Sequence, residues 1–445
     1  MLCTKRIVFC LLALVFINSA LLFRLLELNI FLQIPVLACL AAAFIYYNIR
    51  PGTDLVSPEG QKQLVAGYEL LAASGFIFTC QILIYLYVIN APALHVPTWV
   101  LALNGVISAL LIYVILLNGF IRVFAASKQL GIILRTVLLF LWWVPVLNIV
   151  LIGVTCGTVK AEYKFLYKKR LLNGERKGKE ICKTQYPILL VHGIFFRDWK
   201  HFNYWGRIPA ELTGNGAVVA YGNHDSSASV EQSAHELKAR ILAVLEETGA
   251  EKVNIVAHSK GGIDSRYAIS CLGMDEVVAS LTTINTPHRG CRFVGKILQK
   301  APKRLISTVG KHYNSIFTKL GDGQCDFYGG VSELTAEKCA ELNEKLPDKD
   351  GVLYQSAGSK MSSGSRAILP LKVGYAVIKP LDGDNDGLVS TESMKWGNLL
   401  GVAEPAGKKG ISHGDMIDLT RKNIKGFDVC EFYVQLISGL KERGL

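Results

Sequence analysis

The first 158 residues constrain the fold more than any other feature, because they carry almost no charge. They contain eight Lys or Arg and four Asp or Glu, and most of the other residues are apolar. A helix needs about 20 apolar residues to cross the core of a bilayer. Five segments are long enough to do so: Ile7–Phe23, Ile30–Tyr47, Leu71–Val88, Trp99–Phe120 and Ile132–Val154. We expect residues 1–158 to form an all-α, multi-pass transmembrane domain of four or five helices.

Two other interpretations of these segments are disfavoured. A cleaved signal peptide has an apolar run of about 7–15 residues and a small-residue cleavage site, and neither matches the first segment. Five buried helices of a soluble protein would need a very large apolar shell around them. The chain is therefore expected to be an integral membrane protein, located in the cell membrane.

Positive charge is concentrated directly after these segments. Nine Lys or Arg and three Glu lie between Lys160 and Lys183, which gives +6 of the total net charge of +12. Residues 1–158 contribute +4, so only +2 remains for the rest of the chain, which argues against a nucleic-acid-binding face. We expect residues 159–184 to be a basic juxtamembrane linker. It either contacts anionic lipid, at about 1 kcal/mol per basic residue, or is a solvated linker with ordinary positive-inside bias.

The distribution of charge also predicts an orientation. Basic residues before the first segment, after the second and after the fourth favour a cytoplasmic N-terminus. Five crossings would then place the basic linker outside, against the same rule. Either one segment is re-entrant or the basic charges serve another purpose. The fifth segment is the candidate for a re-entrant one because it contains Arg135, Pro145 and Asn148. Four crossings would leave the C-terminal domain facing the cytoplasm. The cysteines are widely scattered and include no C-x-x-C pair, so they are expected to be free thiols. Free thiols are typical of a reducing compartment and therefore also indicate a domain that faces the cytoplasm.

Residues 185–445 show apolar strands that alternate with helical patterns. The expected strands are 187–191, 217–220, 253–256, 277–284, 352–356 and 373–378, and the expected helices are 227–247 and 259–270. This alternation indicates a mostly parallel sheet with helices on both faces. Residues 291–346 show helical patterns without a strand, and we expect an insertion over the sheet there.

A candidate nucleophile lies at the end of the third expected strand. Ala257-His258-Ser259-Lys260-Gly261-Gly262 follows a buried strand and opens a helix, which is the pattern of a nucleophile elbow. The small residues permit a turn too sharp for larger side chains, so that the Ser259 hydroxyl is exposed above the sheet. Such short strings also occur by chance, and the strand before and the helix after give this one its weight.

An elbow serine needs a base, an acid that orients the base, and donors for an oxyanion. Among the downstream histidines, only His413 comes late enough to follow a further strand and an acidic loop. That loop offers Asp382, Asp384 and Asp386, and the residues alone do not choose among them. His192-Gly193-Ile194 ends the first strand, so the N–H groups of Ile194 and Lys260 are candidate oxyanion donors. The Lys260 side chain is expected to point to solvent.

Four motifs, 191–194, 257–267, 286–290 and 385–390, look like those of the bacterial true lipases, the triacylglycerol lipases of α/β-hydrolase fold. The resemblance extends over about residues 186–439. It implies an α/β-hydrolase domain at 185–445 with a lid within the insertion, the nucleophile Ser259, the acid Asp386 and the base His413. His192, Gly193, His258, Gly261 and Gly262 support the motifs, and His258 and His288 are expected to be packed neighbours.

The sequence departs from this family in its membrane-spanning third and in its calcium ligands. The family's structural calcium uses two aspartates, of which Asp415 matches one. Gly364-Ser365-Arg366 stand where the other aspartate is expected. The sequence therefore gives only weak support for calcium, through Asp415, and predicts no other cofactor. Nearby aromatic residues between Phe195 and Trp205 fit either the core or an acyl-binding pocket.

The predicted function is a membrane-anchored serine hydrolase that cleaves carboxylic esters of lipids, triacylglycerol or related acylglycerols, through an acyl-enzyme. A phospholipase or lipid acyltransferase with the same triad is one alternative. A non-catalytic membrane scaffold that kept a hydrolase-like domain is the other.

Overall fold

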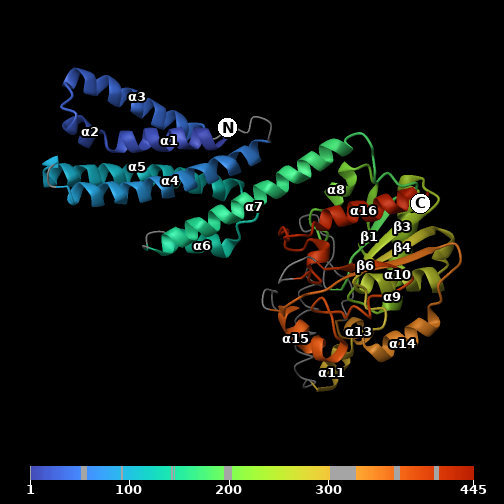
Figure 1. Cartoon of the computed structure of the whole chain (residues 1–445). Coiled ribbons are helices and arrows are strands. Elements are labelled where there is room, and N and C mark those ends of the chain that lie inside the picture. Colours follow the sequence, from blue (N-terminus) through green and yellow to red (C-terminus); the bar gives the residue numbers. More distant parts are fainter. Residues whose placement is uncertain are drawn as a thin grey trace. The chain divides into compact units, whose positions relative to one another are not determined.

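The structure is a computed structural model that describes residues 2–51, 58–91, 94–141, 144, 146–194, 203–300, 327–364, 371–404 and 410–445. The chain forms two compact units, residues 1–174 and 175–445 (Figure 1). Each is described by itself below. The boundary lies inside the stretch expected as a basic linker, most of which is helical.

The first unit consists of helices, as its composition predicts. These are α1 (Leu2–Ile17), α2 (Ser19–Leu25), α3 (Ile30–Ile49), α4 (Glu59–Ile89), α5 (Thr98–Ala126), α6 (Ile132–Leu141) and α7 (Leu147–Arg176). Within the described residues, α3, α4 and α5 are long and apolar enough to cross a membrane. α1 and α2 form a pair bent by 68°, which would make a fourth, broken span.

A cluster of buried polar side chains forms hydrogen bonds at the break between α1 and α2. The Asn104 side chain donates to the carbonyl of Ile17 at 2.8 Å, where the helix is interrupted. Asn18 and Gln81 exchange hydrogen bonds of 2.8 and 2.9 Å, and Gln81 also donates to Asn104. In an apolar medium an unsatisfied backbone carbonyl costs several kcal/mol, so these amides make the bend tolerable.

The segment Ile132–Val154, which the sequence left open as a fifth span or a re-entrant segment, is not one continuous helix. The structure has two separate helices here, and α6 has only 10 residues. At 1.5 Å per residue it is about 15 Å long, half the thickness of a bilayer core. Leu138 of α6 and Leu151 of α7 both belong to one buried apolar cluster, to which α4 and α5 also contribute.

A buried carboxylate closes this hairpin at its base. Glu162 of α7 accepts hydrogen bonds from Ser127 Oγ at 2.6 Å and from the Lys128 N–H at 2.8 Å. Ser127 and Lys128 lie in the connection from α5 to α6. Arg135 reaches back to three carbonyls around the end of α5, those of Phe124, Ser127 and Leu130. These bonds bring residue 162 of α7 back beside residues 127 and 128, which follow the end of α5.

The second unit contains a six-stranded sheet in the order β2-β1-β3-β4-β5-β6, with all neighbours parallel. Its strands are β1 (Ile188–Val191), β2 (Val219–Tyr221), β3 (Val253–His258), β4 (Val278–Ile284), β5 (Leu353–Ser359) and β6 (Asn398–Ala403). This is the mostly parallel α/β-hydrolase sheet that the sequence predicts. The first five strands match the expected ones.

Helices cover both faces of this sheet (Figure 1). Ile188 and Leu190 of β1 pack with α8 (Ile208–Gly214) and α16 (Val429–Glu442). Leu189 and Val191 face α9 (Val230–Thr248) and α10 (Lys260–Cys271). Successive residues of a strand point to opposite faces, so β1, which is covered on both sides, is apolar throughout.

Two elements differ from expectation. The stretch expected as a strand at 373–378 is helix α15 (Leu371–Asp382). Helical spacing explains it, because Leu371 and Gly374 both lie against Gly387, whereas Val373 and Val377 are exposed. Strand β6 was not predicted, because it is an edge strand that is mostly exposed and therefore lacks a buried apolar run.

The expected insertion contains helices α11 (Arg292–Lys300), α13 (Phe327–Ser332) and α14 (Ala336–Lys345). The family resemblance implies a lid within 291–346, and residues 301–326 of that insertion lie outside the described residues.

Candidate active site

Ser259 stands at a strained turn between β3 and α10. Its φ of 55° and ψ of −131° are rare for a residue with a side chain. The Ser259 N–H donates to Ile284 O at 3.0 Å, and its carbonyl accepts from the Gly262 N–H at 3.1 Å. β4 on one side and the first turn of α10 on the other therefore hold the strained backbone in place.

Three glycines permit the close packing that this turn requires. A Cβ on Gly261 would lie 3.0 Å from the Val191 carbonyl, and one on Gly262 would lie 2.7 Å from Thr286 Cγ2. A Cβ on Gly193 would lie 2.7 Å from the Ser259 Cβ. Gly193 therefore brings the backbone after β1 directly against Ser259.

Asp386 and His413 form a close pair. His413 Nδ1 lies 2.6 Å from Asp386 Oδ2, and the His413 N–H donates to the Asp386 carbonyl at 2.9 Å. Asn285 donates to the same carboxylate oxygen at 2.6 Å. The N–H groups of Leu388 and Val389 donate to Oδ1 at 2.8 and 2.7 Å. Four donors thus fix the direction of a carboxylate that is fully buried.

The structure places the other two acidic candidates elsewhere. Asp384 pairs with Lys360 and Lys379, and these hydrogen bonds lower its pKa. Asp382 lies 3.5 Å from Arg292. Of the three aspartates that the sequence left open, Asp386 is therefore the one whose side chain contacts His413. Asn285, at the end of β4, is a partner that sequence reasoning missed.

His258 links the elbow to His413. Its ring lies 4.5 Å from the His413 ring, centroid to centroid, which brings His413 next to the nucleophile elbow. Tyr204 Oη accepts from the Gly193 N–H at 3.1 Å and lies 2.7 Å from His258 Nδ1. Since the hydroxyl accepts one bond, its proton is available for Nδ1. Burial, and then the neighbouring His413, lower the pKa of His258 well below 6.5, so it is neutral.

The expectation that the Lys260 side chain points to solvent is wrong. The side chain is fully buried, and its Nζ donates to Asp264 Oδ1 at 2.7 Å and to Ser233 Oγ at 3.0 Å. Asp264 lies one helical turn after Lys260, so the two face each other on α10. The spacing of four residues was visible in the sequence and could have revealed this pair.

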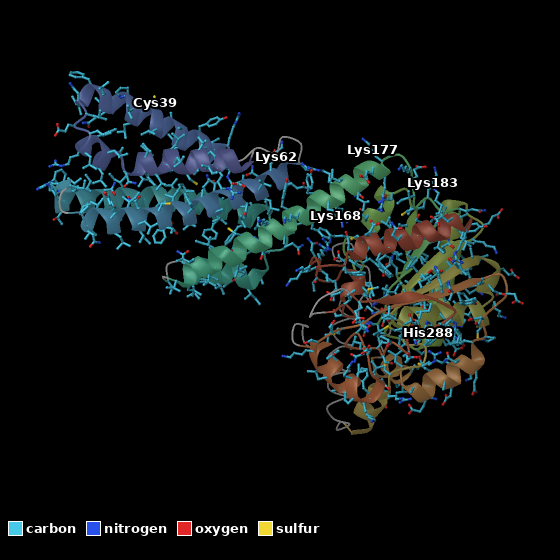
Figure 2. The ribbon with its side chains drawn as sticks, in the orientation of Figure 1. Cys39, Lys62, Lys168, Lys177, Lys183 and His288 are labelled. Carbon is cyan, nitrogen blue, oxygen red and sulfur yellow. The ribbon has the colours of Figure 1, made fainter. Side chains whose placement is uncertain are left out.

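His288 is buried within the second unit (Figure 2). Its Nε2 lies 2.9 Å from Thr283 Oγ1, and its ring stacks on Trp396 at 5.1 Å. The Arg266 guanidinium lies 3.4 Å from the centroid of the Trp396 ring. Burial lowers the pKa of His288 well below 6.5. These contacts support the interpretation of His288 as a packed residue.

The candidate calcium ligand Asp415 has a local role. Its Oδ2 accepts from the Ser412 N–H at 3.0 Å and from Ser412 Oγ at 2.7 Å, which holds the turn after His413. In the described part of the chain, no three His, Cys, Asp or Glu side chains gather as a metal site. The expected second ligand position, at 364–366, has no carboxylate in the sequence.

Comparisons with known proteins find lipases similar to this chain. Residues 185–290 match the family model described as lipase (class 2). A triacylglycerol lipase of Vibrio cholerae is 31% identical over 242 residues, which cover 49% of this chain and 76% of that protein. A triacylglycerol lipase of Pseudarthrobacter phenanthrenivorans is 28% identical, over 54% of this chain and 96% of that protein. The mature lipase BlEst2 of Bacillus licheniformis is 19% identical over 57% of this chain and 92% of its own, with a TM-score of 0.42.

The buried histidines predict a loss of stability in acid. A histidine whose pKa is lowered by folding stabilises the protein above its unfolded pKa of 6.5, and this contribution is lost as the pH falls from there toward the folded value. For His288 we therefore expect the free energy of unfolding to fall as the pH is lowered from 7 to 5. Hydrogen exchange of β4, corrected for its intrinsic pH dependence, measures the free energy of opening. The variant His288→Gln should lose less over this range; equal losses in both chains would contradict the assignment.

Proposed function

We propose a function from one premise: this chain belongs to the family of bacterial true lipases, the triacylglycerol lipases of α/β-hydrolase fold. It is a carboxylic ester hydrolase. We propose that it is a membrane-anchored serine lipase that cleaves acylglycerols. The observation that carries this proposal is the Asp386–His413 pair next to the strained Ser259.

In the proposed mechanism, Ser259 Oγ attacks the ester carbonyl while His413 takes its proton. Asp386 engages His413 Nδ1, so Nε2 is the nitrogen that serves the serine. The imidazolium then protonates the departing alcohol, which leaves an acyl group on Ser259. Water, activated by the same histidine, releases the fatty acid and restores the serine. Ser259, His413 and water supply every bond and proton, so the chemistry draws on no cofactor.

The oxyanion that forms in the attack needs donors in place beforehand. The Lys260 N–H follows Ser259 at the start of α10. The Ile194 N–H follows Gly193, whose backbone lies against Ser259. These positions support the two N–H groups as the oxyanion hole.

The substrate class rests on the relatives and on the apolar first unit. The relatives above bear the name triacylglycerol lipase. An acylglycerol dissolved in a bilayer is available to an anchored enzyme. Phospholipids share the ester chemistry, so the same triad would also serve a phospholipase or an acyltransferase.

We expect Ser259→Ala to abolish ester hydrolysis, because the alanine removes the nucleophile. The measurement is fatty acid release by the full chain from triacylglycerols of graded chain length, with phospholipid and an acyl acceptor supplied in parallel. Losses of about 10⁴-fold or more are typical when a nucleophile is removed.

The matched control is Ser265→Ala. Ser265 is buried on the same helix, where its hydroxyl donates to the Gly261 carbonyl at 2.7 Å. This variant should keep most of its activity. Equal rates for the native chain and Ser259→Ala would contradict the mechanism. Release from phospholipid alone, or transfer of the acyl group, would replace the proposed substrate class.

We infer that the catalytic unit lies on the cytoplasmic side of the membrane. Arg122 at the end of α5 donates to the carbonyls of Asn48 and Ile49 at the end of α3, so these basic helix ends share one level. The α6–α7 hairpin returns to that level at Glu162, because Glu162 bonds to residues that follow α5. Four crossings followed by a re-entrant hairpin place all basic ends on one side, as the positive-inside rule favours.

Tags at the two ends of the chain test this orientation. In membrane vesicles of known sidedness, we expect both tags to be accessible from the cytoplasmic face, and a label in the loop at 90–98 from the opposite face. Accessibility of the two ends from opposite faces would mean an odd number of crossings and would contradict the re-entrant hairpin.

Exposed lysines on α7 support contact with anionic lipid. Lys160, Lys164 and Lys168 are exposed and spaced four residues apart, so they form a stripe along the helix, called the lysine stripe here. Lys168 is labelled on α7 in Figure 2. Tyr167 and Leu171 are exposed on the same face. Basic and apolar side chains together are typical of a helix at a lipid headgroup surface.

Replacing the lysine stripe by glutamine should weaken binding of anionic lipid by about 1 kcal/mol per lysine at low salt. Retention of a fluorescent phosphatidylglycerol by the detergent-solubilised full chain measures this. A control variant removes the same charge from the exposed lysines of the catalytic unit, Lys338, Lys422 and Lys425. Equal weakening in both variants would indicate a general charge effect and would contradict a specific contact.

A further inference from the structure

Lys260 and Asp264 form an ion pair that is fully buried within the first turns of α10. Withdrawing two charges from water costs free energy that their attraction rarely exceeds, so a buried pair is weak evidence of a contribution to stability. Lys260 is also the residue whose N–H follows the nucleophile. Ser233 on α9 accepts a second bond from Lys260 Nζ, which fastens this turn to the neighbouring helix.

Polar contacts continue from this pair toward the other side of the site. Asp264 Oδ2 lies 3.4 Å from His224 Nε2, and the His224 ring stacks on that of His192 at 4.6 Å. His192 Nδ1 lies 3.1 Å from the Gly193 carbonyl oxygen. The side chains of Asp264, His224 and His192 are buried.

The Gly193 carbonyl has a second partner, the Ser226 hydroxyl, which donates to it at 2.8 Å. This carbonyl and the Ile194 N–H belong to the same peptide unit. A trans peptide is planar, with its C=O and N–H pointing in opposite directions. Fixing the oxygen on Ser226 therefore fixes the direction of the Ile194 N–H.

The geometry points to one buried polar network that positions both oxyanion donors, with Lys260 and Asp264 at one end and Ser226 at the other. This inference rests on the function proposed above. The members are positioning residues, because they act through the backbone N–H groups of Lys260 and Ile194 rather than on the substrate.

The charges around Asp264 are consistent with this role. The titratable groups that face it are Lys260, His192, Asp225 and His224. Burial raises the pKa of Asp264 to about 6, against the opposing effect of the Lys260 ammonium. Without the lysine, the carboxyl would lose its main stabilising charge, so the two residues must be replaced together.

The test compares the full chain with the double variant Lys260→Met/Asp264→Leu, which removes both charges and keeps apolar side chains in their place. We expect kcat for a soluble short-chain ester to fall about tenfold, with KM unchanged, because displaced donors act on the transition state. Affinity for a trifluoromethyl ketone, which forms an oxyanion adduct at the serine, should fall by a similar factor.

Arg266→Met is the matched control. Arg266 is a buried cation on the same helix, but its contacts are Trp396, Asn343 and the Leu346 carbonyl. Its loss should lower stability and leave kcat near the native value. A fall in kcat equal to that of the double variant would show that any buried charge on α10 matters, and would overturn the inference.

Ser226→Ala tests the other end should the double variant not fold. It removes one hydroxyl and should lower kcat severalfold with KM unchanged. Native kcat in this variant, or in a folded double variant, overturns the inference while leaving the proposed function intact. A native chain without hydrolysis would overturn the proposed function itself.

Discussion

The strained backbone of Ser259 is the constraint on which the second unit depends. A φ of 55° for a residue with a side chain is costly unless its surroundings hold it. The paired strands β3 and β4 hold the Ser259 backbone at their carboxyl ends. Gly261 and Gly262 let α10 begin immediately after Ser259. The same turn presents the serine at the carboxyl edge of the sheet, where Asp386 and His413 also lie.

Buried polar groups at this edge are treated in two different ways. The Asp386 carboxylate is satisfied mainly by neutral donors, namely two backbone N–H groups and an amide, and it offers one oxygen to His413. Lys260 and Asp264 instead neutralise each other. The first arrangement orients a histidine, and the second holds the start of a helix. Both replace water with fixed dipoles or charges, which is the condition for stabilising a transition state inside a protein.

Much of this could be predicted from local sequence pattern. Largely apolar runs reveal strands that are covered on both faces, which is why β1, β3 and β4 match expectation. The half-exposed segment at 373–378 has the same β-branched composition, but its packing against Gly387 is non-local, so a strand was expected where α15 lies. The residues alone did not choose among the three aspartates, because the choice of Asp386 rests on its contact with His413, 27 positions away. The prediction that the Lys260 side chain points to solvent was wrong. It applied the general preference of lysine for the surface and overlooked the partner Asp264 one helical turn away.

The most direct test of the central claim is where an activity-directed fluorophosphonate reacts with the folded, full chain. Such a reagent forms a covalent bond with a serine only where a base and an oxyanion hole activate it. The account predicts a single adduct on the peptide that contains Ser259, and none after His413→Ala. An intact chain without an adduct, or an adduct on another serine, would contradict the assignment of Ser259 as the nucleophile.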